Sequence, residues 1–256
     1  MSKTNKIMSW YGWLPDRPDY RDKLYAAIVA PPKKLPASVD LRATCSGVEN
    51  QGQLGSCTAN ALVGNLEFLE RKAGQPAVNL SRLFVYYNER ALEGTVNEDS
   101  GAFLRDGIKT LVKQGVCTEA KWPYTISKFA LKPPAACFKQ ALAHQALSYH
   151  RILTLKEMKT CLAEGYPFVF GFTVYDGFES DAVAKTGQVD LPKPAEKAIG
   201  GHAVMAVGYN DATQRFLIRN SWDIDWGMKG YFTMPYDYVA NTSLADDFWT
   251  IRSFEN

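Results

Sequence analysis

The 256-residue sequence lacks the features of several functional classes. No apolar run approaches the roughly 20 residues that a membrane span needs, and no basic cluster is longer than Lys33-Lys34. The net charge of +2 gives no electrostatic footprint for nucleic acid. Histidine is scarce, with three copies, and neither C-x-x-C nor H-x-x-x-H occurs. We therefore expect no membrane partner, no nucleic-acid partner, no metal and no cofactor.

The N-terminus also lacks the hydrophobic region of a secretion signal. This favours a cytoplasmic protein, and export by a route that leaves no N-terminal mark is the alternative. Five cysteines are present, an odd number. Apart from Cys57 there are four: Cys45, Cys117, Cys137 and Cys161. We expect these four to be reduced in the cytoplasm, whereas in an oxidising compartment they could form disulfides in three different pairings.

The chain divides by pattern. Residues 1–34 form an N-terminal extension in which aromatics, prolines and charges mix without a period, and Pro31–Pro36 is typical of a stiff linker. The remainder, residues 35–256, is predicted to be the main domain. From about 45 to 146 the pattern is helical, with helices predicted over 57–71, 81–94, 102–114 and 135–144. From about 147 to 256, after one more helix over 155–164, short apolar runs at 168–174, 203–209, 215–219 and 231–234 predict strands. The order indicates an α+β fold with two lobes and a groove between them.

One cysteine has a distinctive setting. A glycine-rich turn leads into Cys57, which opens a helical run through Leu62, Leu66 and Leu69. A thiol at a helix start lies over unpaired backbone N–H groups and the positive end of the helix dipole, which favour the thiolate. Gln51 lies six positions earlier, and the flexible turn between them allows its side-chain amide to lie close to the Cys57 thiol. The sequence therefore predicts a nucleophilic cysteine.

Three motifs then resemble those of papain-like cysteine peptidases, of the bacterial, xylellain-like type with a short N-terminal extension. The stretch from Gln51 to Cys57 resembles the Q-G-x-C-G-S-C segment, Gly201 to Val204 the histidine strand, and Asn220 to Gly227 the N-S-W-G-x-x-W-G block. His202 lies 145 positions after Cys57, within the about 130–150 that this family shows. The resemblance covers the chain from about residue 35 to about 251.

The resemblance implies a fold, an activity and a catalytic set. We expect a papain-like two-lobed fold with a helical first lobe, an antiparallel β-barrel-like second lobe and the active site between them. The implied activity is that of a cysteine endopeptidase acting through an acyl-thioester on an extended peptide or protein, by a chain that is a monomer. Cys57 would be the nucleophile, His202 the base, Asn220 the orienting residue and Gln51 an oxyanion donor.

Further positions are implied to bind substrate. Trp222 and Trp226 resemble the indoles that cover the Asn–His pair and line the cleft. The other implied positions are Ser100, Gly101, Ala102, Phe103, Gly171, Gly200 and Gly201, which fall where the family pairs with substrate backbone or lines its main specificity pocket. Small residues there suggest a roomy apolar pocket, and alignment on Phe248 places Asp246 at its floor, where it would admit Lys or Arg.

Two departures from the family pattern lead to hypotheses. Leu54 stands where the family has a cysteine of its first-lobe disulfide, so that disulfide is absent. The extension lacks the long helical prodomain, and we hypothesise that the segment Trp10–Asp22 lies in or beside the groove as a strap that restrains activity; the alternative is that it only pads the back of a lobe. Two rival functions remain: a thiol acyltransferase, and a catalytically silent peptide-binding relative.

Overall fold

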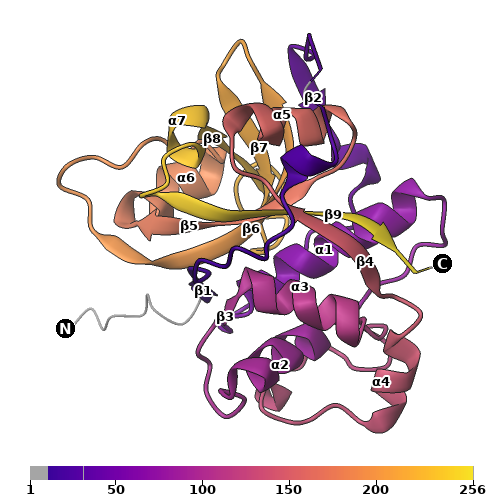
Figure 1. The fold of residues 1–256 in the computed structure, drawn as a ribbon. Coiled ribbons are helices and arrows are strands. Elements are labelled where there is room, and N and C mark those ends of the chain that lie inside the picture. The colour runs from indigo at the N-terminus through magenta and orange to yellow at the C-terminus, as the bar shows by residue number, and fades with distance from the viewer. Residues whose placement is uncertain (1–10, 31, 256) are drawn as a thin grey trace, which may run out of the picture.

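The computed structural model of the chain describes residues 11–30 and 32–255. Trp10 and Pro31, which fall in the predicted strap and linker, lie outside the described residues. The α+β class is confirmed: helices dominate the first half and a large antiparallel sheet the second (Figure 1). Within the described ranges, no helix is long and apolar enough to cross a membrane.

The helices begin and end where local chemistry specifies. Ser81 caps the second helix, because its Oγ accepts from the backbone N–H of Phe84 at 3.1 Å, and Gly94 ends it in the left-handed conformation. The α-helices are α1 (Cys57–Lys72), α2 (Arg82–Glu93), α3 (Leu104–Lys113), α4 (Ala135–Ala141), α5 (Leu155–Ala163), α6 (Asp181–Thr186) and α7 (Tyr236–Val239). Short 3₁₀ turns lie at Tyr25–Ala27, Arg42–Thr44, Ile126–Lys128 and Asp176–Glu179.

The main sheet has the strand order β4-β9-β5-β6-β7-β8, with β2 paired to β6 off this path. Its strands are β2 (Ser38–Asp40), β4 (Ala146–Arg151), β5 (Phe168–Tyr175), β6 (Ala198–Asn210), β7 (Arg215–Arg219), β8 (Tyr231–Pro235) and β9 (Ala245–Phe254). All its neighbours are antiparallel. The sheet is open: over the described part of the chain its end strands β4 and β8 do not pair, so the second lobe is barrel-like without being a closed barrel.

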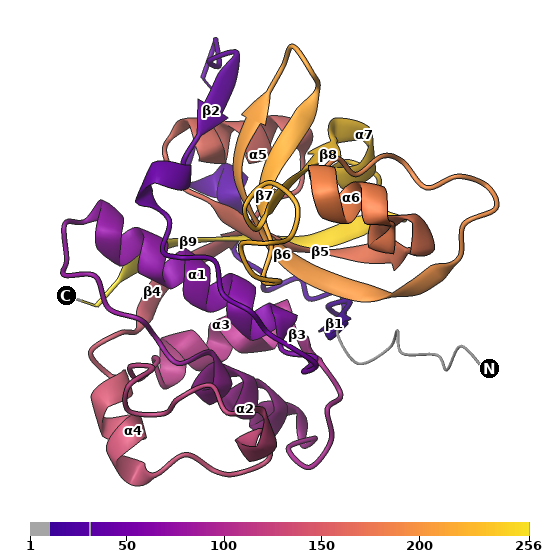
Figure 2. The ribbon, with the colours of Figure 1, turned by 180° about the vertical axis from the view of Figure 1, so that it is seen from behind.

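The two halves meet along α1. This helix lies between the other helices of the first half and the sheet, as both views show (Figures 1 and 2). Gly64 of α1 faces the sheet: a Cβ there would lie 3.9 Å from Met205 Cε of β6, an ordinary contact, and 2.5 Å from Nη1 of Arg219, whose side chain reaches over from β7. One apolar core joins α1, α2 and α3 to the inner side of the sheet, and a second fills the sheet's other side. The N-terminus of α1 is thereby fixed against β6.

A carboxylate contact holds the turn beside Leu54, the position at which the family disulfide is missing. Asp99 accepts from the backbone N–H of Gly55 at 3.0 Å and from the hydroxyl of Tyr86. Gly55 belongs to the turn that leads into α1, so this contact fixes the turn without a covalent bond. All five cysteines are free thiols.

The N-terminal segment crosses the boundary between the halves. Its strand β1 (Trp13–Leu14) pairs in parallel with β3 (Ala102–Phe103), a second, two-stranded sheet. The Ala102 N–H donates to the Gly12 carbonyl at 2.7 Å. We call residues 11–22 the strap; it lies beside the start of the first lobe's α3 and against β5 and β6 (Figure 1).

Candidate active site

Cys57 is the first residue of α1 and is fully buried. Two hydrogen bonds to Ser56, the residue before Cys57, stabilise the start of the helix. The Asn60 amide donates to the Ser56 carbonyl at 2.9 Å, and Ser56 Oγ lies 2.5 Å from the Tyr124 hydroxyl. The turn that the sequence indicated therefore positions a sulfur over the first N–H groups of a helix, as expected.

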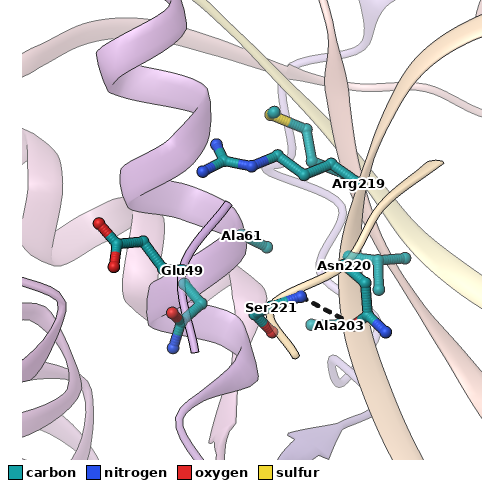
Figure 3. A pocket seen from close by; sticks show the side chains of 9 residues that line it. Glu49, Ala61, Ala203, Arg219, Asn220 and Ser221 are labelled. Atoms are coloured by element: carbon teal, nitrogen blue, oxygen red, sulfur yellow. Dashed lines mark hydrogen bonds between the residues drawn. The ribbon is translucent and has the colours of Figure 1, made fainter. Parts of the chain in front are cut away.

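His202 and Asn220 are brought together from two neighbouring strands. His202 lies in β6, Asn220 directly follows β7, and His202 Nε2 is 2.8 Å from Asn220 Oδ1. The same oxygen accepts the Ser221 backbone N–H at 2.8 Å, the dashed contact in Figure 3. Because Oδ1 is an acceptor, Nε2 must carry the proton in the neutral ring. The other nitrogen, Nδ1, is then the basic one, and it has no hydrogen-bond partner among the described residues.

The sulfur and the histidine strand meet. The backbone N–H groups of Ala203, Gly12 and Thr58 interact with the Cys57 thiolate, and Ala203 directly follows His202. These N–H groups favour the thiolate, but burial outweighs them and raises the pKa of Cys57 to about 12. The helix start acts in the expected direction, since the Thr58 N–H lowers the pKa of Cys57, but the loss of water around the sulfur has the larger effect.

The histidine is shifted in the direction that also disfavours charge. Complete burial lowers the pKa of His202 to about 4, although the hydrogen bond with Asn220 opposes the shift. Both shifts thus favour the neutral forms, a thiol and a neutral imidazole. The chemistry that needs a thiolate requires solvent or substrate to replace what now covers the pair.

Gln51 lies between the segment that follows Asn220 and the turn that precedes Cys57, and it is fully buried. Its Oε1 accepts from Ser221 Oγ at 2.6 Å and its Nε2 donates to the Leu54 carbonyl at 2.9 Å. Its backbone N–H donates to the Ser221 carbonyl at 2.9 Å. The segment after Asn220 and the segment before Cys57 are thus joined through Gln51, which fixes the amide at the site.

Aromatic rings cover the Asn–His pair. The Trp222 ring lies 5.0 Å from that of His202 at an interplanar angle of 31°. Trp226 packs edge-on against Trp222 at 5.3 Å, and Phe178 lies within 5.6 Å of both indoles. The sequence placed both tryptophans here; Phe178, from the turn after β5, was not foreseen.

The strap covers the remaining side. A Cβ on Gly12 would come within 1.7 Å of the Gly55 carbonyl oxygen, so only glycine fits between the strap and the Cys57 turn. Tyr11 lies 6.0 Å from the His202 ring, edge to face, and its hydroxyl donates to Glu179 at 2.5 Å. The described part of the strap therefore lies over the nucleophile and the histidine.

Trp13 fills a pocket beside them. A Cβ on Gly171 would lie 1.9 Å from Trp13 Cε2, and one on Gly201 would lie 2.8 Å from Cε3, so the two glycines form the wall on which the indole lies. At Gly200 the nearest atom would be Tyr11 Cβ, at 2.7 Å. All three predicted pocket glycines contact the strap.

The predicted positions at 100–103 separate into two groups. Gly101 and Ala102 meet the strap backbone: a Cβ on Gly101 would lie 2.2 Å from the Gly12 oxygen, and Ala102 donates to that oxygen. Ser100 Oγ instead donates to Thr95 Oγ1 at 2.8 Å. Phe103 lines a cavity further along the strap. All of the predicted substrate contacts remain predictions.

The carboxylate that reaches Trp13 is Asp247. Its Oδ2 accepts from Trp13 Nε1 at 3.0 Å and the side chain is fully buried, whereas the Asp246 side chain is 45% exposed and lies on Arg151. A bulge explains this, because the register of β9 on β5 shifts between residues 246 and 249 and Asp247 has a φ of 58°. Simple alternation would not bury Asp247 and Phe248 together. The role of Asp246 at the pocket floor stays a prediction.

A further acidic residue lies directly behind the nucleophile. Thr58 Oγ1 donates to Glu89 Oε2 at 2.9 Å, and Glu89 is fully buried. Burial raises the pKa of Glu89 well above its usual value, and nearby Glu93 adds to the shift. The sequence noted Thr58 as unusual but gave no signal for Glu89, because the contact joins two helices.

The comparisons with known proteins agree with this geometry. A family profile described as "Papain family cysteine protease" matches residues 35–249. An uncharacterised peptidase C1-like protein of Acanthamoeba polyphaga mimivirus is 42% identical over 277 residues, which cover 97% of this chain and 88% of that protein.

Solved structures show the same likeness. The crystal structure of xylellain, a cysteine protease from Xylella fastidiosa, superposes with a TM-score of 0.91 at 42% identity and covers 99% of both chains. A procathepsin B from Trypanosoma congolense superposes with a TM-score of 0.75 at 18% identity, covering 96% of this chain and 87% of its own; at that identity it shows the fold alone.

Proposed function

Because the chain belongs to the papain family of cysteine proteases, we propose that it hydrolyses peptide bonds within extended peptides or proteins through Cys57, His202 and Asn220. The chain is a cysteine peptidase by its family; the endopeptidase action and the catalytic set are the proposal. The observation that carries it is the assignment of the His202 tautomer by Asn220, which leaves the basic Nδ1 without another partner.

The steps follow from the atoms present. Nδ1 of His202 takes the Cys57 proton, and the thiolate attacks the substrate carbonyl. The Cys57 backbone N–H and the Gln51 amide stabilise the oxyanion. The imidazolium then protonates the leaving amine, which leaves an acyl-thioester, and water activated by His202 releases the acid. Asn220 holds the ring in one orientation throughout.

We further propose that the strap is an intramolecular regulator that keeps this site inactive. The Gly12 N–H of the strap bonds the Cys57 sulfur, so the docked strap occupies the position that a substrate would take beside the nucleophile. It also removes water from Cys57 and His202, and this burial is the cause of both pKa shifts toward the neutral forms. Displacement of the strap returns the pair to conditions in which the thiolate forms.

An epoxide-type thiol probe and a fluorogenic peptide series test the activity. Trp13→Ala should be labelled and should hydrolyse peptides, wild type should do both more slowly because the docked strap restrains the site, and Cys57→Ala should do neither. Cys161→Ser is the matched control, since Cys161 is another buried free thiol, remote from the site on Thr250, and it should behave as wild type. Hydrolysis retained by Cys57→Ala would contradict the proposal.

Two further measurements separate the rival functions. Gln51→Ala should keep its labelling yet lose about 10²–10³ in kcat, the usual effect of one oxyanion donor; an unchanged kcat would remove Gln51 from the mechanism. Product analysis with added amine should give the free acid. Predominant amide product would favour acyl transfer, and absence of labelling in both wild type and Trp13→Ala would favour a peptide-binding protein.

A further inference from the structure

The pocket that Trp13 occupies is built for an aromatic side chain. Trp13 is buried to 7% exposure, and its indole lies on the backbone of Gly171 and Gly201. Trp13 follows Gly12, whose N–H faces the Cys57 sulfur. The pocket therefore lies one residue along the strap from the Cys57 sulfur. A substrate in the groove either fills this pocket with a side chain or leaves the pocket empty.

The floor of this pocket is a hydrogen-bond acceptor. Asp247 Oδ2 accepts from Trp13 Nε1 at 3.0 Å and from the backbone N–H of Asp16 at 2.7 Å. Its other oxygen, Oδ1, accepts from Arg151 Nη2 at 3.1 Å. Asp247 itself is fully buried. Among the described residues, Oδ1 of the carboxylate is therefore bonded by the protein body, whereas both donors to Oδ2 come from the strap.

Displacement of the strap leaves Asp247 Oδ2 without its hydrogen-bond donors. Both of its donors leave together, while the Arg151 contact to Oδ1 stays. A buried acceptor without a partner is unfavourable. A substrate side chain that brings an N–H to the same point therefore restores the hydrogen bond that the strap had made to Oδ2. A side chain of the same shape without a donor leaves the oxygen unpaired.

The charges around the floor decide between a cationic and a neutral donor. The strap contributes two carboxylates and the body contributes two carboxylates and two guanidinium groups: Asp16 and Asp22 from the strap, and Asp246, Asp247, Arg105 and Arg151 from the body. Arg105 bonds Asp22 at 2.7 Å, and Arg151 bonds both Asp22 and Asp246. When the strap leaves, two positive and two negative groups remain, so no uncompensated negative charge is left to attract Lys or Arg.

We propose that Asp247 is a specificity-determining residue, and that the pocket vacated by Trp13 selects substrates with a neutral aromatic hydrogen-bond donor, tryptophan above all, next to the residue that bears the scissile carbonyl. This rests on the peptidase activity proposed above. It differs from the expectation of a roomy apolar pocket and from that of a pocket in which Asp246 admits Lys or Arg, and the peptides below separate the three.

The test uses the full-length Trp13→Ala protein, in which the pocket is empty of its own indole. Fluorogenic peptides carry tryptophan, 3-benzothienylalanine, phenylalanine or arginine at the position in question. Benzothienylalanine keeps the shape of the indole but replaces the N–H by sulfur. Both peptides must displace the same strap, so the strap equilibrium cancels in the ratio of their kcat/KM values. At pH 8, above the pKa of about 7 to which burial raises Asp247, the tryptophan peptide should be preferred over the benzothienylalanine peptide by about tenfold to a hundredfold, as expected for a hydrogen bond to a charged acceptor.

A matched pair of second substitutions assigns the effect to Asp247. In the Trp13→Ala background, Asp247→Asn should reduce the preference to a few-fold, since asparagine keeps the shape and tolerates the left-handed backbone but lacks the charge. Asp246→Asn removes the same charge one residue away, where the carboxylate bonds Arg151 and not the indole, and should keep the preference.

The outcomes separate the two proposals. Equal kcat/KM for tryptophan and benzothienylalanine, or a preference for arginine over tryptophan, would overturn the role of Asp247 while leaving the peptidase activity intact. Equal loss of the preference in Asp246→Asn and Asp247→Asn would also overturn it. Failure of Trp13→Ala to hydrolyse any of the peptides would overturn the proposed activity and this inference together.

Discussion

Removal of the Trp13 side chain should expose Cys57 without changing any residue of the catalytic set. Trp13 is 7% exposed and supplies the strap's large apolar contact with the pocket, together with its hydrogen bond to Asp247. In the Trp13→Ala protein the strap keeps its backbone pairing to Ala102 but loses the indole. The equilibrium between the docked and the displaced strap should therefore move toward displacement.

The size of the effect follows from the burial. Truncation of a buried Phe or Trp to Ala costs about 3–5 kcal/mol in protein cores. We take the lower end, about 3 kcal/mol, because water can enter the vacated pocket from the groove. Since about 1.4 kcal/mol corresponds to a factor of ten, the displaced population should rise by roughly a hundredfold.

The assay is the rate at which a small alkylating reagent modifies Cys57 in the full-length protein. Cys57 is fully buried and its pKa is raised to about 12 by that burial, so modification requires the strap to be displaced. The observed rate then reports the displaced fraction, provided that reclosing is faster than alkylation. Trp13→Ala should react about a hundred times faster than wild type, with labelling located by mass spectrometry.

A control on the same segment makes the result specific. Tyr20 is 98% exposed, so Tyr20→Ala should leave the alkylation rate within about twofold of wild type. If Trp13→Ala reacted no faster than Tyr20→Ala, the strap would not control access to Cys57, and the reasoning from burial would be refuted.

Three other predictions concern the same region. Gly171→Ala should displace Trp13, since its Cβ would lie 1.9 Å from the indole; alkylation of Cys57 should accelerate while tryptophan peptides become poorer substrates, and an unchanged alkylation rate would contradict this. Burial, with nearby Asp16, raises the pKa of Asp247 to about 7; the folded state thus holds a proton that the unfolded state releases above about pH 4, and stability from this group is lost as the pH rises through 7. The free energy of unfolding of Asp247→Asn relative to wild type should therefore increase between about pH 5 and pH 8 in chemical denaturation, and a flat difference would argue against a raised pKa. Burial also raises the pKa of Glu89 well above its usual value, which favours the neutral carboxyl; Glu89→Gln should therefore stay within about 1 kcal/mol of wild-type stability and Glu89→Ala should cost about 2 kcal/mol or more, whereas a large loss in Glu89→Gln would indicate a buried carboxylate.

Much of the fold was predictable because its signals are local. The helix beginning at Cys57 and the helix between Ser81 and Gly94 were predicted within a residue or two, since the apolar period and the end residues all lie within each helix. The apolar runs that became β5, β7 and β8 were read in the same way.

Other elements depend on distant partners and were missed. β4 and β9 pair with each other across about a hundred residues, and their sequences mix polar and apolar side chains without clear alternation. The helix predicted from Ala102 begins only at Leu104, because Ala102 and Phe103 are taken into the pairing with the strap. In each case the tertiary contact outweighs the local preference.

The sequence by itself determined the chemistry of this protein. The order and spacing of Cys57, His202 and Asn220, with Gln51 before the helix, predict a thiol nucleophile, a base, an orienting amide and an oxyanion donor, the roles that we propose for them. The family comparisons agree with that conclusion at the level of a cysteine peptidase.

Only the tertiary structure decided how deeply the site is buried and which aspartate contacts Trp13. The helix start favours a thiolate, yet burial beneath the strap raises the pKa of Cys57, because loss of water outweighs a few backbone N–H groups. A bulge in β9 turned Asp247, and not Asp246, toward Trp13. Burial and register arise from contacts between segments far apart in the chain, and no local pattern records them.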